Sequence, residues 1–224
     1  MQFNIEGEYP VLKVQLNQGE SIITSSGNMS WMTRGIEYDT STRGGVLKGF
    51  SRALTGESMF QNKYTAVADG QEIAFASSMP GKIVHIQMQG NTLIAQKSAF
   101  LASTEGVNFE VALTKKFSTG LLGGEGFVLQ RFTGEGDLFL EADGSLVEYD
   151  LKPGEDLLVD QGHVFTLDAS VQYNIETVKG LKNMMFGGEG AFLVRLTGPG
   201  KVVLQTLPIV NLASKILPFA AHKG

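Results

Sequence analysis

The chain has 224 residues, a formal net charge of -5 and a sequence pI near 5.3. It contains no cysteine, which excludes disulfides, thiolate zinc sites and cysteine nucleophiles. Hydrophobic residues make up 42% and charged residues 18%, which excludes a disordered chain, and the acidic balance makes nucleic acid an unfavoured partner.

The first residues, Met1–Glu6, have neither the basic nor the apolar region of a signal peptide. No run of about 18 apolar residues follows, so no transmembrane segment is expected. A cytoplasmic location is therefore the expectation from the sequence.

Strand signals alternate with turns along the chain, which has 28 glycines and only 6 prolines. The expected strands are Tyr9–Leu16, Lys82–Met88, Glu125–Thr133, Ser145–Leu151 and Glu189–Thr197. A Thr-Gly turn is expected to end two of them, after Thr133 and Thr197. Asp143-Gly144 predicts a hairpin turn, because Gly accepts the left-handed backbone that such turns need.

The C-terminal tail is the clearest helix candidate. Its apolar residues recur at helical spacing, and Pro218 is expected to end the helix. These residues are Ile209, Leu212, Ala213, Ile216 and Leu217. We expect the helix to cover an edge of the sheet or barrel. The alternative is a helix for a membrane surface or a partner, for which Lys215 and Lys223 supply little charge.

Internal repetition is the most informative property of the sequence. Gly123-Gly124-Glu125-Gly126 recurs 64 residues later as Gly187-Gly188-Glu189-Gly190. Six further identities follow at the same offset, so ten of the eighteen positions from 123 to 140 are repeated. A more diverged copy begins at Gly56-Glu57, and all three copies keep Gly-Glu, five residues, a base, one residue and Thr.

A second block repeats independently. Gly19, Gly90 and Gly154 each begin a stretch that reaches an aromatic residue 19 positions later. The two blocks predict a single domain of three segments, 1–77, 78–144 and 145–208, followed by a helical tail at 209–224. No linker separates the segments. We expect an all-β fold in which three β-rich repeats share one core in a pseudo-threefold arrangement, as a sandwich or a barrel-like structure.

With these repeated blocks in view, the chain resembles the altered-inheritance-of-mitochondria family, which is grouped with the tryptophan RNA-binding attenuation protein as TRAP-like. The resemblance covers nearly the whole chain, including Gly187–Gln205 and the following Thr206-Leu207-Pro208. It implies three β-rich repeats of antiparallel strands and brings no catalytic residues. RNA binding is not carried over, because the repeated Lys and Arg clusters that support it in the attenuation protein have no counterpart here.

The repeated acid and base of each copy are the candidate site. They are Glu57, Lys63, Glu125, Arg131, Glu189 and Arg195. Six residues of strand span about 20 Å, so a Glu cannot reach its own base but could meet the base of a neighbouring segment. We expect a structural ring of ion pairs between segments. The alternative is a charged mouth that binds a partner or a small anionic ligand.

Other residues give weaker signals. His85 and His163 fall outside the repeated pattern, and no pair of histidines has metal-ligand spacing, so no metal or other cofactor is expected. Trp31, the only tryptophan, is expected in the core, with an exposed interface as the alternative. No serine motif for nucleophilic catalysis occurs.

These observations favour a protein that is not an enzyme. The first hypothesis is a β scaffold that forms a homo-oligomer and binds a protein or a membrane-associated partner. The second is a protein that binds a small anionic ligand between repeats. RNA binding is less favoured than either.

Overall fold

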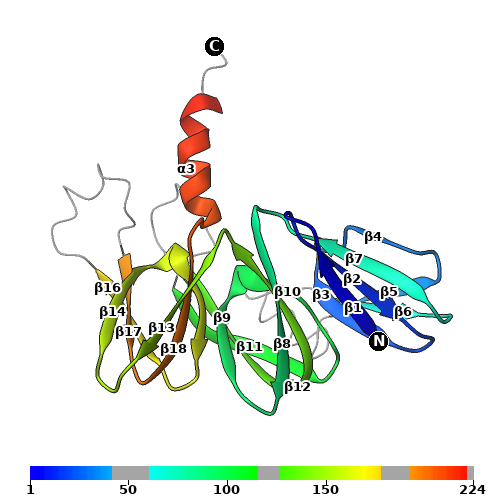
Figure 1. The fold of residues 1–224 in the computed structure, drawn as a ribbon, viewed down its shortest axis with the longest axis horizontal. Helices are drawn as coiled ribbons and strands as arrows, with labels where there is room; N and C mark the ends of the chain where they lie inside the picture. The colour runs from blue at the N-terminus through cyan, green and yellow to red at the C-terminus, as the bar shows by residue number, and fades with distance from the viewer. Residues whose placement is uncertain (42–60, 116–126, 178–191, 221–224) are drawn as a thin grey trace.

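The structure, a computed structural model, describes residues 1–41, 61–115, 127–177 and 192–220. Figure 1 shows three groups of strands side by side along the long axis, one from each predicted segment. The helix α3 (Ile209–Ala220) follows the third group. The expected all-β fold with a short C-terminal helix is confirmed.

The three segments contain similar series of strands, with an additional strand, β1, at the start of the first. The first holds β1 (Gln2–Glu6), β2 (Val11–Leu16), β3 (Ser21–Ser25), β4 (Trp31–Met32), β5 (Ile36–Ser41), β6 (Gln61–Ala66) and β7 (Gln71–Ala76). The second holds β8 (Gly81–Gln89), β9 (Leu93–Gln96), the 3-10 turn η1 (Lys97–Ala99), β10 (Phe100–Ser103), β11 (Val107–Lys115) and β12 (Phe127–Asp143). The third holds β13 (Leu146–Leu151), β14 (Asp156–Asp160), the 3-10 turn η2 (Gln161–His163), β15 (Val164–Asp168), β16 (Gln172–Thr177), β17 (Phe192–Thr197) and β18 (Gly200–Gln205).

The same antiparallel pairings recur in each segment. β2 pairs with β7, β8 with the second half of β12, and β13 with β18. β3 pairs with β6, β9 with the first half of β12, and β14 with β17. The opposite edges of β7, β12 and β18 pair with β4, β10 and β15, respectively.

Two further pairings join the segments. β10 of the second segment pairs with β3 of the first, and β15 of the third pairs with β9 of the second. The result is one sheet that runs through all three segments, flanked by two smaller sheets. These sheets are open in the described residues, so the barrel-like alternative is wrong. The pseudo-threefold arrangement stays a prediction.

Alternation of side chains explains where the core lies. In β2, Leu12, Val14 and Leu16 are fully buried, while Gln15 between them is exposed, as expected for a strand with one buried face. Three apolar clusters form along the molecule, and each includes side chains from two segments. Leu101 of β10, for example, packs into the cluster of the first segment, so the junctions between segments are part of the core.

The turn expected after Thr133 does not form. β12, which is 17 residues long, continues through this position, so the chain does not reverse there. Gly134 makes this possible, because its φ of +99° and its close approach to the Gly106 carbonyl exclude a side chain. After Thr197 the strand does end, at a bend over residues 198–199, but β18 then continues in the same direction as β17.

The turn at Asp143-Gly144 forms, with Gly144 at φ +80°, but it is not a hairpin. The strands on either side of it, β12 and β13, pair with β8 and β18 instead of with each other. The turn therefore links the second and third segments.

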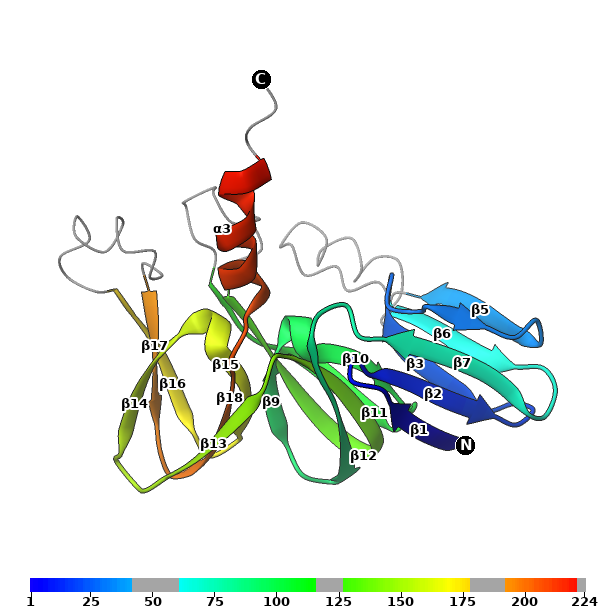
Figure 2. The same cartoon turned by 45° about the horizontal axis from the view of Figure 1, so that its top comes forward.

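Two expectations for the helix are wrong. α3 continues past Pro218 to Ala220, because a proline near a helix end removes little of the hydrogen bonding. It also stands away from the described sheets in Figures 1 and 2, so within the described residues it does not cover a sheet edge.

Candidate functional site

Each repeated base forms an ion pair with a carboxylate outside the repeated pattern. Lys63 of β6 contacts Glu105, which follows β10 of the next segment. Arg131 of β12 lies 3.1 Å from Glu110 of β11. Arg195 of β17 lies 2.9 Å from Glu176 of β16 and 3.7 Å from Asp156 of β14. Glu57, Glu125 and Glu189 lie outside the described residues, so the predicted acid–base ring stays a prediction.

The chemistry of these three bases follows from their position. All are partly exposed on strand faces, where a carboxylate neutralises each of them, from the adjacent strand for Arg131 and Arg195 and from the turn after β10 for Lys63. Lys63 differs from the other two because its partner lies across a junction between segments. An anion would have to compete with these carboxylates, which weakens the alternative of a charged mouth.

Both histidines in the described residues have structural partners. The His85 Nε2 atom lies 2.8 Å from Asp137 Oδ1, and the ring packs against Phe3 and Phe139. The His163 Nδ1 atom lies 2.8 Å from the carbonyl oxygen of Gln205. Within the described ranges, no three His, Asp or Glu side chains come together as a group that could hold a metal ion.

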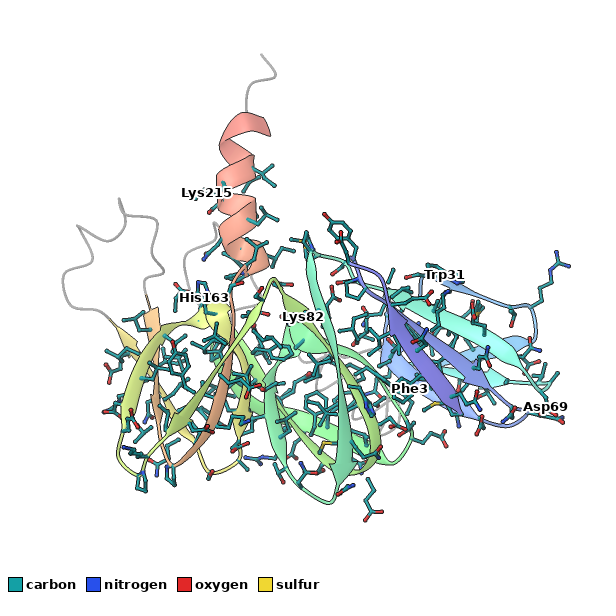
Figure 3. The ribbon with its side chains drawn as sticks, viewed as in Figure 1. Phe3, Trp31, Asp69, Lys82, His163 and Lys215 are labelled. Carbon is teal, nitrogen blue, oxygen red and sulfur yellow. The ribbon has the colours of Figure 1, made fainter. Side chains whose placement is uncertain are left out.

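The base of α3 is held by two residues that sequence reasoning did not connect with it. Asp143, at the end of β12, accepts a hydrogen bond from the Ile209 backbone N–H at 3.0 Å and so caps the helix from another element. His163, which Figure 3 labels below the helix, places its Nε2 atom 3.2 Å from Asn211 Nδ2 in the first turn. Burial raises the pKa of the Asp143 carboxyl, while the Ile209 hydrogen bond acts in the opposite direction.

Beyond its first turn, α3 exposes apolar side chains. Ile216 and Leu217 are 55% and 56% exposed, and Ile209 and Val210 are exposed as well. At 3.6 residues per turn, Ile209 and Ile216 lie on one face, and Ser214 and Lys215 lie away from it. The sequence pattern predicted this apolar face, and the structure leaves its two ends exposed while Leu212 and Ala213 in its middle are partly buried.

Trp31 is a correction to the sequence analysis. It was expected in the core, but it lies on β4 at an edge of the first segment and is 46% exposed. Its partner in the sheet is Ala74 of β7. The exposed alternative is therefore the correct one, and Figure 3 shows Trp31 within the group of strands that lies farthest from the third segment.

Comparisons with known proteins support the family suggested by the repeats. The model of the family described as mitochondrial biogenesis AIM24 matches residues 3–207. An uncharacterised protein of Streptococcus pyogenes is 26% identical over 226 aligned residues, which cover 96% of this chain and 90% of that protein. A crystal structure of a Streptococcus pyogenes protein has a similar fold, with a TM-score of 0.78, 23% identity and coverage of 97% of this chain and 99% of that one.

Proposed function

The chain belongs to the mitochondrial biogenesis AIM24 family, and we propose that it is a non-catalytic β scaffold that self-associates and presents α3 to a protein or membrane-associated partner. The observation that carries the proposal is the exposure of apolar side chains at both ends of α3, on a helix that stands away from the described sheets (Figure 2). Exposed apolar patches of this kind mark interaction sites.

The base of α3 supports this role. The Asp143 cap and the His163–Asn211 contact fix the direction in which the helix leaves the body. A helix held in place loses less conformational entropy when it binds than a free segment would. Its apolar residues at positions i, i+3, i+4 and i+7 suit an apolar groove on a partner.

The charge of α3 favours a protein groove over an anionic membrane surface. Lys215 is the only charged residue between Ile209 and Ala220. Surface-binding helices usually have several Lys or Arg residues on the polar face, which attract anionic lipid. In the described part of the chain, no helix has both the length and the apolar character needed to cross a bilayer.

Photo-cross-linking in the native host tests the proposal. A benzophenone amino acid is placed at Ile216, on the apolar face, or at Ser214, on the polar face, of the full-length chain. We expect a discrete cross-linked partner from position 216 and much less from position 214. Equal labelling from both positions, or none from either, would contradict the proposal. Mass spectrometry of the adduct distinguishes a protein partner from a lipid.

A further inference from the structure

The two junctions inside the chain follow one rule. In each junction, the strand that follows the 3-10 turn of one segment pairs with the strand of the preceding segment that lies beside the repeated base, β3 or β9. In the first junction Ala102 and Ser103 of β10 lie opposite Thr24 and Ile23 of β3. In the second, Thr166 and Leu167 of β15 lie opposite Ala95 and Ile94 of β9.

By the same rule, one strand at each end of the molecule has no partner from a neighbouring segment among the described strands. Trp31, Ala102 and Thr166 occupy equivalent places, opposite Ala74, Phe139 and Val203 in their own segments. β4 is thus the counterpart of β10 and β15. Likewise Leu158 is the counterpart of Ile23 and Ile94, because each lies opposite the repeated base, Arg195, Lys63 or Arg131.

Within the described ranges, β4 pairs only with β7 and β14 only with β17. Each therefore has one edge without a ladder partner, and such an edge is a template for pairing with another chain. Figure 1 places β14 and β4 at opposite ends of the long axis, so the two edges do not meet within one chain.

The exposed side chains lie where the internal junctions bury theirs. Leu158 is 54% exposed, whereas its counterparts Ile23 and Ile94 are 4% and 2% exposed. Trp31 is 46% exposed, whereas its counterparts Ala102 and Thr166 are buried. Both unused edges therefore have apolar residues in the positions that a neighbouring segment covers elsewhere in the same molecule.

We propose that β14 of one chain pairs antiparallel with β4 of a second copy, which continues the sheet head to tail. This inference rests on the proposed self-association and names its surface. The internal pairings fix the register: Met32 lies opposite Leu158, and Trp31 lies opposite Val159. A head-to-tail contact closes into a ring or grows as a filament, depending on the rotation between copies.

Charge and packing bear on the strength of this contact. Arg34 follows β4 at the position that corresponds to Glu105 after β10. Glu105 forms an ion pair with the repeated base Lys63 across the first junction. In the proposed contact Arg34 faces Arg195, whose neighbours Asp156 and Glu176 give that cluster one net negative charge. Ser30 stands where the internal junctions have the buried side chains Leu101 and Phe165. The contact between copies is therefore weaker than the internal ones and depends on protein concentration.

The absence of native cysteine allows a direct test by disulfide trapping. Two full-length variants, Met32→Cys and Leu158→Cys, are purified separately, mixed at high concentration and oxidised mildly. Residues directly opposite in an antiparallel pair have the Cβ separation that a disulfide can bridge. The control mixture is Trp31→Cys with Leu158→Cys, because both positions are exposed and a shift of one residue turns the first thiol to the other face of the sheet.

We expect roughly tenfold more cross-linked heterodimer from the matched mixture than from the control mixture, since only the matched thiols share a face. Equal yields would overturn the pairing. A double variant, Met32→Cys with Leu158→Cys, that closes within a single chain would also overturn it. In either case, wild-type protein that still forms oligomers would leave the proposed self-association standing, whereas protein that stays monomeric would remove both.

Discussion

The repeated bases show how a conserved pattern within one chain can serve different contacts. Lys63, Arg131 and Arg195 lie at equivalent places, yet Lys63 contacts a carboxylate in the turn after β10, while the two arginines contact carboxylates on β11 and β16. All three are about two-fifths exposed, and an exposed ion pair contributes only about 0.2–1 kcal/mol. These pairs therefore favour the correct register between strands, while buried apolar side chains supply most of the stability.

Asp143 carries a pH-dependent part of the stability. Burial raises the pKa of its carboxyl in the folded protein above the ordinary value of 3.8. At pH values between the ordinary pKa of Asp143 in the unfolded chain and its raised pKa in the folded protein, the folded state binds more protons than the unfolded state. The free energy of unfolding therefore falls as pH rises through this range. We expect Asp143→Asn, which keeps an acceptor for the Ile209 N–H, to remove this loss.

The measurement is urea unfolding of wild type and Asp143→Asn at a series of pH values from acid to neutral. Asp150→Asn, which changes an exposed aspartate on β13, controls for the change in net charge. Wild type should lose stability relative to Asp143→Asn as pH rises through the window. Parallel curves for these two proteins would show that Asp143 has no such role.

At the scale of elements, β12 depends on a glycine at its bend. A Cβ atom at Gly134 would lie 2.2 Å from the Gly106 carbonyl oxygen, and the residue has a φ of +99°. Gly154, in a turn, also has a positive φ, but a Cβ atom there would meet nothing within 4 Å. A substitution at Gly154 therefore introduces backbone strain alone, whereas one at Gly134 introduces both backbone strain and a steric clash.

We predict that Gly154→Ala costs about 1–2 kcal/mol of unfolding free energy, the cost of a left-handed backbone for a residue with a side chain. Gly134→Ala should cost clearly more, because the two backbones must also move apart. Chemical denaturation of both variants measures the difference. Equal losses would mean that β12 and Gly106 adjust without strain.

The sequence predicted the elements well where the local pattern decides them. The strand expected at Lys82–Met88 is β8, and the alternation in β2 gives its buried face. It failed where distant contacts decide. The turn at Asp143-Gly144 suggested a hairpin, but which strands pair depends on the sheet. Trp31 was assigned to the core because the matching positions of the other segments hold Phe100-Leu101-Ala102 and Val164-Phe165-Thr166. Among the described strands, however, β4 pairs with β7 alone, and Trp31 is 46% exposed.

The candidate site divides in the same way. The repeat identified Lys63, Arg131 and Arg195 as equivalent, and the structure gives their carboxylate partners. Their partners could not be predicted, because Glu105, Glu110 and Glu176 fall outside the repeated pattern. Asp143 and His163 carried no signal for a role at α3, since each reaches the helix from a distant part of the sequence.

At the scale of the whole molecule, the three segments are joined by one type of junction. This leaves two strands, β4 and β14, that each have one edge without a partner among the described strands. The apolar residues on these edges and on α3 account for much of the exposed apolar surface that a scaffold would use. Self-association through the edges would display several copies of α3 on one assembly. Several linked copies bind a partner that has repeated sites more tightly than a single copy does.

Sedimentation of the wild-type protein over a wide concentration range tests the central claim, self-association, most directly. A single chain has a mass of 24.1 kDa. We predict that the average mass rises with concentration toward multiples of this value, because the contact between copies is weaker than the junctions within a chain. A mass that stays at one chain up to the highest concentration would contradict the account.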